Sequence, residues 1–316
     1  MSAVRVLEPG LLTTVQDAAG RPGLGRFGVA PGGALDAASA QLANRLVGNR
    51  GEEPVLEITL HGPILAWEAA GHVGLAGADL GAVSEHQRLP PGHSYRLPAG
   101  AILRFEGRRH GARAYLAVEG GFAVQPVLGS ASTDRRSGFG GFRGRALAAG
   151  DVLVSAGTAS RHLRSVVASP TRPRPETPIR VVTTPAVLGW FGPDAMEVLT
   201  ATGWAVATDS DRNGIRLVGG RVPAAAGGIA SLGVPVGSIQ VPPSGQPIVT
   251  MADGPVTGGY PVLGVVARAD HGRLAQLAPG DAVRFARIDV ADARSIVVAE
   301  PAIELDAGDV GAAWAG

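Results

Sequence analysis

With 316 residues, the chain is long enough to bury the core of one large domain or of two ordinary ones. Hydrophobic residues make up 45% and charged residues 17%, which is typical of a globular protein rather than a disordered one. The formal net charge is only +1, so there is no electrostatic basis for binding nucleic acid.

Three absences narrow the function further. The chain has no cysteine, which excludes a thiol nucleophile, a thiolate metal site and a disulfide. It has no lysine, because all 28 basic residues are arginine, and this excludes a Walker lysine, a Schiff-base lysine and a biotinylated lysine. The seven histidines show no metal-ligand spacing, so we expect no metal site. With no membrane-spanning run and no signal-peptide core, we expect a cytoplasmic protein without a membrane partner.

The chain begins with two predicted strands, at Val4–Leu7 and Leu11–Val15, followed by a loop dense in glycine. Within this loop, Gly23-x-Gly25-x-x-Gly28 matches the dinucleotide-binding fingerprint. No helix follows it directly, and no acidic residue lies about twenty residues on, where the ribose partner belongs. We therefore interpret the match as a loop without a nucleotide.

Leucine and alanine recur at helical spacing from Leu35 to Leu46, which predicts a helix. Asp36 lies in its first turn, where a carboxylate is favoured by the helix dipole. Ahead of it, Gln16, Asp17 and Arg21 lie among glycines, and they either cap the loop or belong to a binding site.

From Val55 to Val118, short apolar runs alternate with turn residues roughly every eight to twelve positions, which is typical of an antiparallel barrel or sandwich. The high glycine and proline contents, 47 and 24 residues, also favour a mainly β fold with a few short helices. The runs predicted as strands are Val55–Leu60, Ile64–Trp67, Val73–Ala76, Tyr95–Leu97, Ile102–Phe105 and Ala114–Val118.

Prolines concentrate between Ala168 and Pro178, a composition typical of a stiff linker. We therefore predict an N-terminal domain at 1–168, a linker at 169–177 and a C-terminal domain at 178–316. The second domain opens with a predicted strand at Ile179–Val182 and a helix near Asp194 to Leu199. Its Gly280-Asp281 repeats the earlier Gly150-Asp151, which suggests two related β-barrel-like units.

Arginines stand out at two places. Arg135, Arg136, Arg143 and Arg145 crowd one loop, which is either a solvated face or a contact for an anionic substrate or partner. Further on, Arg212 and Arg216 lie in the motif Ser-x-Arg-x-Gly-x-Arg-Leu. They either form a fork for a substrate carboxylate or make ion pairs within the fold.

The stretch from Ser244 to Val266 holds two predicted strands, around Ile248 and around Val262. The connection between them carries Asp253, Thr257, Gly258, Gly259 and Tyr260. It is either a tight hairpin whose polar groups satisfy its own backbone or a binding loop with an acceptor, a hydroxyl and a phenol.

These motifs resemble, in at least five blocks in the same order, the biotin-dependent carboxyltransferase A/B family, also labelled allophanate hydrolase subunit 2. The family includes the component of ATP-dependent 5-oxoprolinase that is designated C. The resemblance is carried by Gln16-Asp17, Gly20-Arg21, Gly33-Ala34-Leu35-Asp36, Gln240-Val241-Pro242, Gly245-Gln246-Pro247-Ile248 and Thr257-Gly258-Gly259-Tyr260-Pro261.

The resemblance implies a cyclophilin-like β-barrel fold and a sister chain that resembles the Kip kinase inhibitor, also labelled allophanate hydrolase subunit 1. It implies an ATP-dependent cyclic-amide hydrolase that is inactive alone, shares ATP with its sister chain and works with a LamB/YcsF-like subunit. We expect Asp17, Asp253 and Tyr260 to be catalytic. The expected substrate-binding residues are Gln16, Arg21, Asp36, Arg212, Arg216, Thr257, Gly258 and Gly259.

Two other functions are compatible with the same family. The chain is alternatively the carboxyltransferase part of urea carboxylase, or an allophanate hydrolase component, using carboxybiotin from another protein. It has no lysine that could carry biotin itself. The third possibility is a non-catalytic module that regulates its sister chain.

Overall fold

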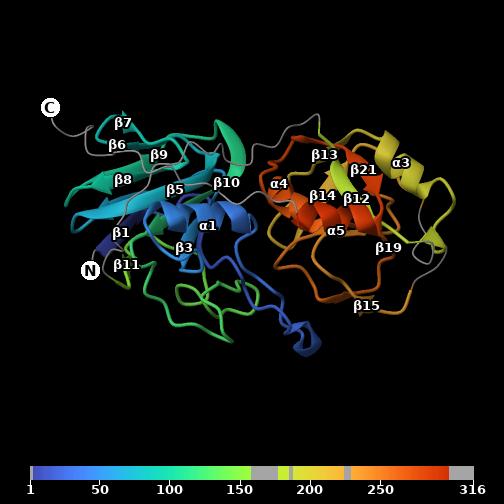
Figure 1. Cartoon of the computed structure of the whole chain (residues 1–316), viewed down its shortest axis with the longest axis horizontal. Coiled ribbons are helices and arrows are strands. Elements are labelled where there is room, and N and C mark those ends of the chain that lie inside the picture. The colour runs from blue at the N-terminus through green and yellow to red at the C-terminus, as the bar shows by residue number, and fades with distance from the viewer. Residues whose placement is uncertain (1–2, 158–176, 185–187, 224–228, 299–316) are drawn as a thin grey trace. The chain divides into compact units, whose positions relative to one another are not determined.

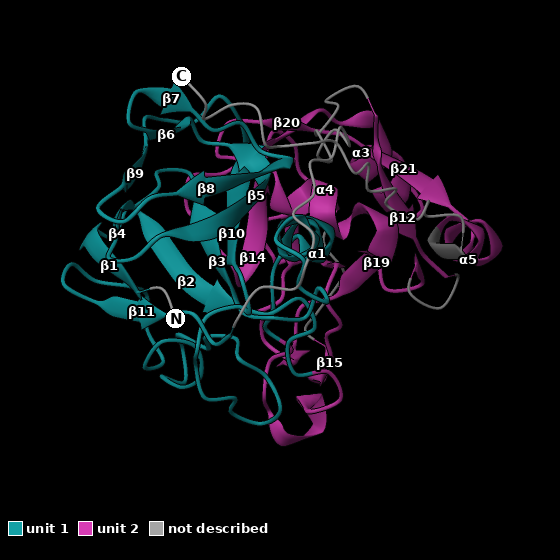
Figure 2. Ribbon diagram, turned by 60° about the vertical axis from the view of Figure 1, so that its left-hand side comes forward, with its two compact units in different colours: residues 1–21, 32–172, 302–316 teal, residues 22–31, 173–301 magenta. Residues whose placement is uncertain are grey.

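The computed structural model describes residues 3–157, 177–184, 188–223 and 229–298 (Figure 1). The chain divides into two compact units, shown in different colours in Figure 2. Unit 1 contains the described residues 3–21 and 32–157, and unit 2 contains residues 22–31 and the described residues from 177 onward. Apart from Thr177, the predicted linker 169–177 lies outside the described residues. The predicted domain limits at 168 and 178 therefore stay predictions.

Unit 1 is built from two antiparallel sheets. The six-stranded sheet has the order β11-β1-β4-β9-β6-β7, with β1 (Ala3–Glu8), β4 (Ile64–Trp67), β6 (Ala82–Ser84), β7 (Gln87–Arg88), β9 (Ile102–Phe105) and β11 (Val152–Val154). The five-stranded sheet has the order β2-β3-β10-β5-β8, with β2 (Leu12–Gln16), β3 (Val55–Thr59), β5 (Gly71–Asp79), β8 (His93–Leu97) and β10 (His110–Val118). Every apolar run predicted as a strand in this half overlaps one of these strands, so these predictions are confirmed.

The main core of unit 1 combines side chains from both sheets. Val6 of β1 and Leu65 of β4 belong to the same buried cluster as Leu56 of β3 and Leu116 of β10. Successive side chains of a strand point to opposite faces of the sheet. Tyr115, the neighbour of Leu116 in β10, therefore lies on the other face, in a second buried cluster. β10 is therefore buried on both faces, which explains its almost continuous apolar run.

Helix α1 (Ala37–Leu46) fills the second cluster, against the outer face of the five-stranded sheet. Asp36 is its N-cap, and the Asp36 carboxylate accepts a hydrogen bond from the Ser39 N–H at 3.1 Å. A Cβ at Gly74 of β5 would lie 2.2 Å from the Ala43 carbonyl oxygen, so the close approach of sheet and helix requires glycine there. The predicted helix is confirmed.

Unit 2 contains an eight-stranded, nearly closed β-barrel sheet of order β20-β13-β14-β17-β16-β19-β12-β21 and a two-stranded sheet of β15 and β18. The barrel pairs are antiparallel except for β12 with β21. The strands are β12 (Ile179–Val182), β13 (Trp204–Val206), β14 (Gly214–Val218), β15 (Leu232–Gly233), β16 (Ser238–Gln240), β17 (Ile248–Thr250), β18 (Thr257–Gly258), β19 (Val262–Val266), β20 (Ala282–Val283) and β21 (Phe285–Ile288). The helices of this unit include η1 (Gly25–Phe27), α3 (Ala195–Ala201), η2 (Arg268–Asp270), α4 (His271–Ala275) and α5 (Val290–Val298). The predicted mainly β fold is thus confirmed.

The strands predicted around Ile248 and Val262 form as β17 and β19, but they do not pair with each other. Both pair with β16, which lies between them in the sheet. The connection from β17 to β19 therefore spans β16, and β18 within it pairs with β15. The hairpin alternative for this stretch is wrong, because a hairpin would join two adjacent strands.

The repeated Gly-Asp sequence forms the same turn in both units. In unit 1 the Gly150 N–H donates to the Val6 carbonyl at 2.8 Å, and in unit 2 the Gly280 N–H donates to the Val206 carbonyl at 2.8 Å. The two glycines have φ of 88° and 86°, which residues with a Cβ rarely adopt. The aspartate after each glycine accepts a hydrogen bond from the amide three residues earlier, at 2.7 and 2.9 Å. The echo in the sequence therefore reflects a shared local structure.

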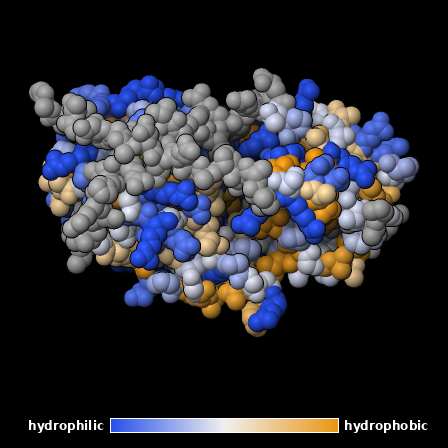
Figure 3. Space-filling model, in the orientation of Figure 1, coloured by the Kyte–Doolittle hydropathy of each residue, from blue (hydrophilic) through white to orange (hydrophobic). Residues whose placement is uncertain are grey.

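Apolar side chains also reach the surface. On the face seen in Figure 3 they lie in separate groups among hydrophilic residues. Scattered exposure of this kind is ordinary and indicates no interface by itself. None of the helices in the described part of the chain is long and apolar enough to cross a membrane.

A buried carboxylate holds the start of β12 in unit 2. Asp270 is fully buried and accepts hydrogen bonds from the Arg180 guanidinium at 2.7 and 2.9 Å. Arg273 donates to it as well, at 3.1 Å. Burial opposes ionisation of Asp270, but the hydrogen bonds from both arginines outweigh it and lower the pKa of Asp270. The carboxylate is therefore ionised in the folded protein.

We expect Asp270→Asn to lower the free energy of unfolding by about 3 kcal/mol at pH 7, because it breaks a buried ion pair. The folded pKa lies below the unfolded value of about 3.9. The contribution of the carboxylate is therefore present above that value and is lost as the pH falls through the folded pKa. Urea unfolding of the full chain at pH 3 to 7 checks this, and the variant should show the weaker acid dependence.

The control for this experiment is Glu68→Gln, which breaks the exposed ion pair between Arg5 and Glu68. It should cost less than about 1 kcal/mol, since exposed pairs are screened by water. Equal losses for the two variants would contradict the role assigned to Asp270.

Candidate functional site

A cavity of about 510 Å³ lies in unit 2, a volume within the usual range for small-molecule sites. The glycine-rich loop, the segment before β16, and β17 with its following connection supply its walls. The lining residues are Gly23, Gly25, Arg26, Pro31, Gly233, Val234, Pro235, Val236, Thr250, Met251, Gly254, Val256 and Thr257. Among these residues Arg26 carries the only charge, and Thr250 and Thr257 add hydroxyl groups. The rest of the lining is small or apolar.

The glycine-rich loop lines this cavity although its neighbours in sequence belong to unit 1. Residues 22–31 belong to unit 2. Gly23 and Gly28 have φ of 83° and 79°, and between them lies a single 3-10 turn, η1 (Gly25–Phe27). A Cβ at Gly25 would lie 3.8 Å from the Val256 side chain on the facing wall. Because η1 is one short turn, it does not provide the helix that a dinucleotide fingerprint requires.

The opposite wall is closely packed and requires glycine at two positions. A Cβ at Gly254 would lie 2.4 Å from the Thr250 side chain and 2.6 Å from the Asn213 carbonyl oxygen. A Cβ at Gly258 would lie 2.8 Å from the Gln240 amide nitrogen. The Thr250 hydroxyl donates to the Gln240 amide oxygen at 3.4 Å. Gln240, which lies in the Gln-Val-Pro motif, thus supports the wall that carries Thr250.

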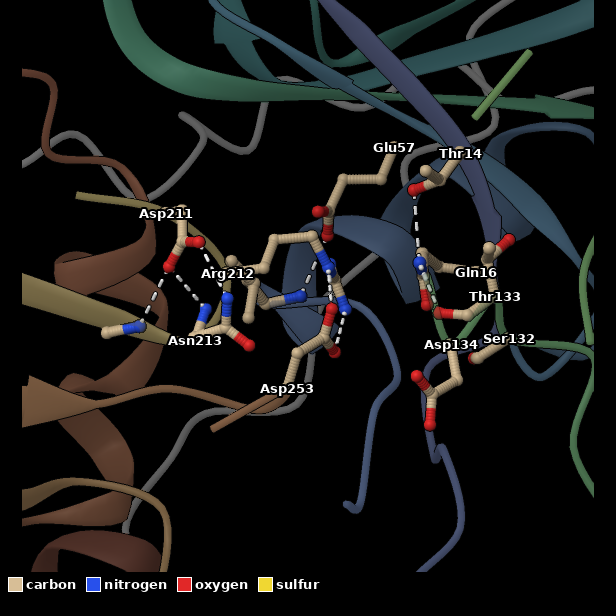
Figure 4. A network of polar contacts seen from close by, with 12 residues as sticks. Thr14, Gln16, Glu57, Ser132, Thr133, Asp134, Asp211, Arg212, Asn213 and Asp253 are labelled. Atoms are coloured by element: carbon tan, nitrogen blue, oxygen red, sulfur yellow. Dashed lines mark hydrogen bonds and ion pairs between the residues drawn. The ribbon is translucent and has the colours of Figure 1, made fainter. Parts of the chain in front are cut away.

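Asp253 is paired with Arg212, as Figure 4 shows. Arg212 Nε and Nη2 donate to the two carboxylate oxygens of Asp253 at 2.7 and 2.8 Å, a bidentate geometry. Arg212 is buried and Asp253 is 14% exposed. Of the two interpretations of Arg212, the ion pair within the fold is the one observed. The predicted parts of Arg212 in substrate binding and of Asp253 in catalysis stay predictions.

Arg216 has a different environment from Arg212. It is half exposed and forms an ion pair with Asp209 at 3.1 Å. The two arginines therefore pair with separate carboxylates of the protein, and the predicted substrate-binding role of Arg216 stays a prediction.

Asp17 holds a loop of unit 1. One carboxylate oxygen accepts hydrogen bonds from the Gly20 N–H at 2.6 Å and the Ser132 hydroxyl at 2.9 Å. The other accepts from the Ser130 hydroxyl at 2.6 Å and the Ala131 N–H at 2.7 Å. We call these four hydrogen bonds the Asp17 clamp. Three of them join the Gln16-Asp17 motif to the loop around Ser132, and the fourth holds the Gly20 N–H.

Arg21 supports the same loop. Its guanidinium donates to the Val127 carbonyl at 2.9 Å and to the Ser132 carbonyl at 2.5 Å, and it lies over the Phe139 ring at 4.9 Å. Gln16 is buried beside this loop, and its amide nitrogen donates to the Thr14 hydroxyl at 3.0 Å (Figure 4). The described contacts of Gln16 and Arg21 are with other residues of the protein. Their predicted roles in substrate binding therefore stay predictions.

Asp36 belongs to a buried polar group at the start of α1. The Asp36 N–H donates to the Tyr115 hydroxyl at 2.8 Å, and that hydroxyl donates to Glu57 at 2.9 Å. Glu57 also accepts from the Leu35 N–H at 2.8 Å. Burial and the neighbouring carboxylates Glu57 and Asp36 raise the pKa of Tyr115, so the hydroxyl remains a donor. These contacts account for Asp36 as a helix cap, while its predicted role in substrate binding is untested.

The residues of the Thr-Gly-Gly-Tyr motif have different positions. Thr257 lines the cavity, and Gly258 packs against Gln240. Tyr260 is 47% exposed, and Gly259 is exposed as well. Arg26 was not predicted as a site residue. It lies within the Gly-x-Gly-x-x-Gly match, which the sequence indicates is a loop that binds no nucleotide.

Gly254→Ala should lower the free energy of unfolding by about 1–3 kcal/mol, because a methyl group there forces Thr250 and its neighbours to move. Gly233→Ala is the matched control, since Gly233 also lines the cavity but nothing lies within 4 Å of an added Cβ. It should change stability by less than about 0.5 kcal/mol. Thermal unfolding of both variants distinguishes them, and a tolerated Gly254→Ala would contradict the packing described.

Asp253→Asn should lower the free energy of unfolding by about 2–4 kcal/mol, because buried Arg212 loses its ionised acceptor. Arg212→Lys keeps the charge but not the two-pronged geometry, so we expect a loss of about 1–3 kcal/mol. Arg216→Lys, at the exposed pair, should cost less than about 1 kcal/mol. Urea unfolding measures all three, and a ranking with Arg216→Lys as the most destabilised would refute this assignment.

Comparison with known proteins gives the family. The model of the carboxyltransferase domain, subdomain A and B, matches residues 27–287. The Escherichia coli component of 5-oxoprolinase that is designated C is 35% identical over 292 residues, covering 92% of this chain and 93% of that protein.

Two solved structures have the same fold. TTHA0988 superposes with a TM-score of 0.81 at 40% identity, covering 90% of this chain and 56% of that chain. The urea amidolyase of K. lactis superposes with a TM-score of 0.86 at 31% identity, covering 94% of this chain and 19% of that chain. This chain thus corresponds to one part of each of these longer proteins. The protein belongs to the family of the carboxyltransferase domain, subdomains A and B.

Proposed function

We propose that this chain is the component designated C of an ATP-dependent 5-oxoprolinase, which opens the lactam ring of 5-oxo-L-proline to give L-glutamate. The observation that carries the proposal is the cavity of unit 2, whose small apolar walls hold two hydroxyls and one guanidinium. The relative named as a subunit of 5-oxoprolinase, which matches over 93% of its own length, supports the choice among the family's activities.

The polar groups of the cavity suit a lactam. An N–C=O group needs an acceptor for its N–H and a donor for its oxygen, and a threonine hydroxyl serves as either. Thr250 and Thr257 supply these hydroxyls, while Val234, Pro235 and Val256 offer apolar surface to the ring carbons. The cavity can therefore hold and orient a small cyclic amide.

The cavity by itself lacks groups for proton transfer. Its lining contains no carboxylate and no histidine. The nearest candidate along the chain is Asp253, which precedes lining residue Gly254 and is held by Arg212. We therefore propose that the active site is completed by a sister chain resembling the Kip kinase inhibitor, and that this chain is inactive alone.

The residues of the cavity fit ATP only in part. Arg26 could contact a phosphate, but within the described ranges no group of three or more histidine, aspartate or glutamate residues could hold a metal ion. Because the cavity lining holds no carboxylate, the protein ligands for a magnesium ion would come from the sister chain. We accordingly propose that ATP is shared with the sister chain, where it activates the lactam oxygen, and that a LamB/YcsF-like subunit completes ring opening.

The second candidate is the carboxyltransferase part of a urea carboxylase. The superposition on the K. lactis urea amidolyase, with a TM-score of 0.86, favours it. In that case the same hydroxyls would bind urea and the ureido ring of carboxybiotin, delivered by another protein because this chain has no lysine. A non-catalytic module that regulates the sister chain is the third candidate.

Reconstitution tests these alternatives. The chain alone should form no glutamate and hydrolyse no ATP, because its cavity lacks groups for proton transfer. Adding the sister chain should produce ATP hydrolysis that depends on 5-oxoproline, and adding the third subunit should yield glutamate. The rate should exceed that of any single chain by about 100-fold or more, the effect of one positioned acid–base or electrostatic group.

The sister chain alone is the control for this experiment, and urea with a carboxybiotin carrier is the competing substrate. Glutamate formation by the single chain would disprove the shared site. Carboxylation of urea without any turnover of 5-oxoproline would favour the second candidate instead.

A further inference from the structure

We infer that Arg26 binds a carboxylate of the ligand in the cavity of unit 2, and that it selects anionic amides over neutral ones. The inference rests on the proposed function for the identity of the ligand. Its physical basis is the position of a single cation in the lining of an otherwise uncharged cavity.

The surroundings of Arg26 leave its hydrogen-bonding groups available. Within the described part of the chain, the only hydrogen bond, ion pair or ring contact of Arg26 is with Phe27, whose ring centroid lies 4.7 Å from the guanidinium carbon. Stacking occupies one face of the planar guanidinium, whereas its N–H donors lie around the edge. Phe27 can therefore hold the group in place without using the donors that a ligand needs.

Other arginines of the chain are already engaged by the fold. Arg212 holds Asp253, Arg180 holds Asp270, and Arg145 holds Asp151 at 2.7 Å. Each of these arginines carries a carboxylate of the protein in the geometry that a substrate carboxylate would take. Arg26 has the same guanidinium group and lines a cavity. Among the described residues no carboxylate pairs with it, so the carboxylate of an anionic ligand could take that place.

The loop geometry keeps Arg26 in the lining. On one side of Arg26, a Cβ added at Gly25 would lie 3.8 Å from the Val256 side chain, and on the other side Gly28 ends the turn with a φ of 79°. Residues with a Cβ rarely adopt that φ, so the end of the turn depends on glycine. With the hydroxyls of Thr250 and Thr257 also in the lining, the cavity offers one site for a carboxylate and two for an amide.

This arrangement identifies a substrate class. A lactam that carries a carboxylate, such as 5-oxoproline, can use the guanidinium and the hydroxyls together. Urea is neutral and forms no ion pair with the guanidinium. Arg26 is thus a specificity-determining residue that favours the small anionic amide.

Isothermal titration of the full chain, alone and with the sister chain, tests the inference. The two probes are L-5-oxoproline and 2-pyrrolidinone, which is the same lactam ring without the carboxylate. The protein should bind 5-oxoproline about 10- to 100-fold more tightly, the effect of a hydrogen bond to a charged group. Arg26→Gln should abolish this preference, and Arg26→Lys should retain part of it.

Arg104→Gln is the matched control, since Arg104 is an exposed arginine of unit 1 that does not line the cavity. It should leave the preference unchanged. A preference that persists in both Arg26 variants, or that is missing from the unaltered protein, would overturn the inference. If the preference follows Arg26 but no complex turns over 5-oxoproline, the carboxylate site stands and the proposed function fails.

Discussion

The Asp17 clamp is the constraint on which the candidate site depends, because it holds the base of the glycine-rich loop. Three of its four hydrogen bonds join the end of β2 to the loop around Ser132, and the fourth comes from the Gly20 N–H at the start of the glycine-rich loop. The Asp17 carbonyl also accepts the Ala34 N–H at 2.8 Å, and a Cβ at Gly33 would lie 3.0 Å from the Gly20 nitrogen. Both stems of the loop are therefore held in unit 1 before residues 22–31 join unit 2. A buried carboxylate is well suited to this task, since each oxygen accepts two hydrogen bonds that a neutral side chain would not match.

The absence of lysine shapes how the protein uses charge. Arginine keeps its proton at any ordinary pH and pairs with carboxylates bidentately, so it serves as a clamp or an anion receptor rather than as a proton carrier. Arg212 and Arg180 show the first use, with the partly buried Asp253 and the buried Asp270 as partners. Arg26, which stacks on Phe27 and lines the cavity, has surroundings that suit an anion receptor. Neither lysine nor arginine can therefore carry a proton in a reaction at the cavity, and other side chains of this chain or of its partner must do so.

Much of the fold could be predicted because it depends on local pattern. Short apolar runs separated by turn residues predicted the strands of unit 1, and helical spacing predicted α1, whose N-cap is Asp36. The glycine before Asp151 and the one before Asp281 indicated a turn that the two units share. The motifs also indicated the family that the comparisons show. The roles of Asp17 and Asp253 in a site were predicted from those motifs and stay predictions.

The sequence by itself determined the elements, the mainly β class and the family, because these follow from neighbouring residues and from motif spelling. Only the tertiary structure decided that β17 and β19 flank β16, that Arg212 holds Asp253, and that residues 22–31 line the cavity of unit 2. The partners in the last two of these contacts lie far apart in the sequence, 41 residues in the case of Arg212 and Asp253. Local propensity cannot choose among such partners, since the choice depends on which chain segments pack side by side and on which buried charges then need a counterion.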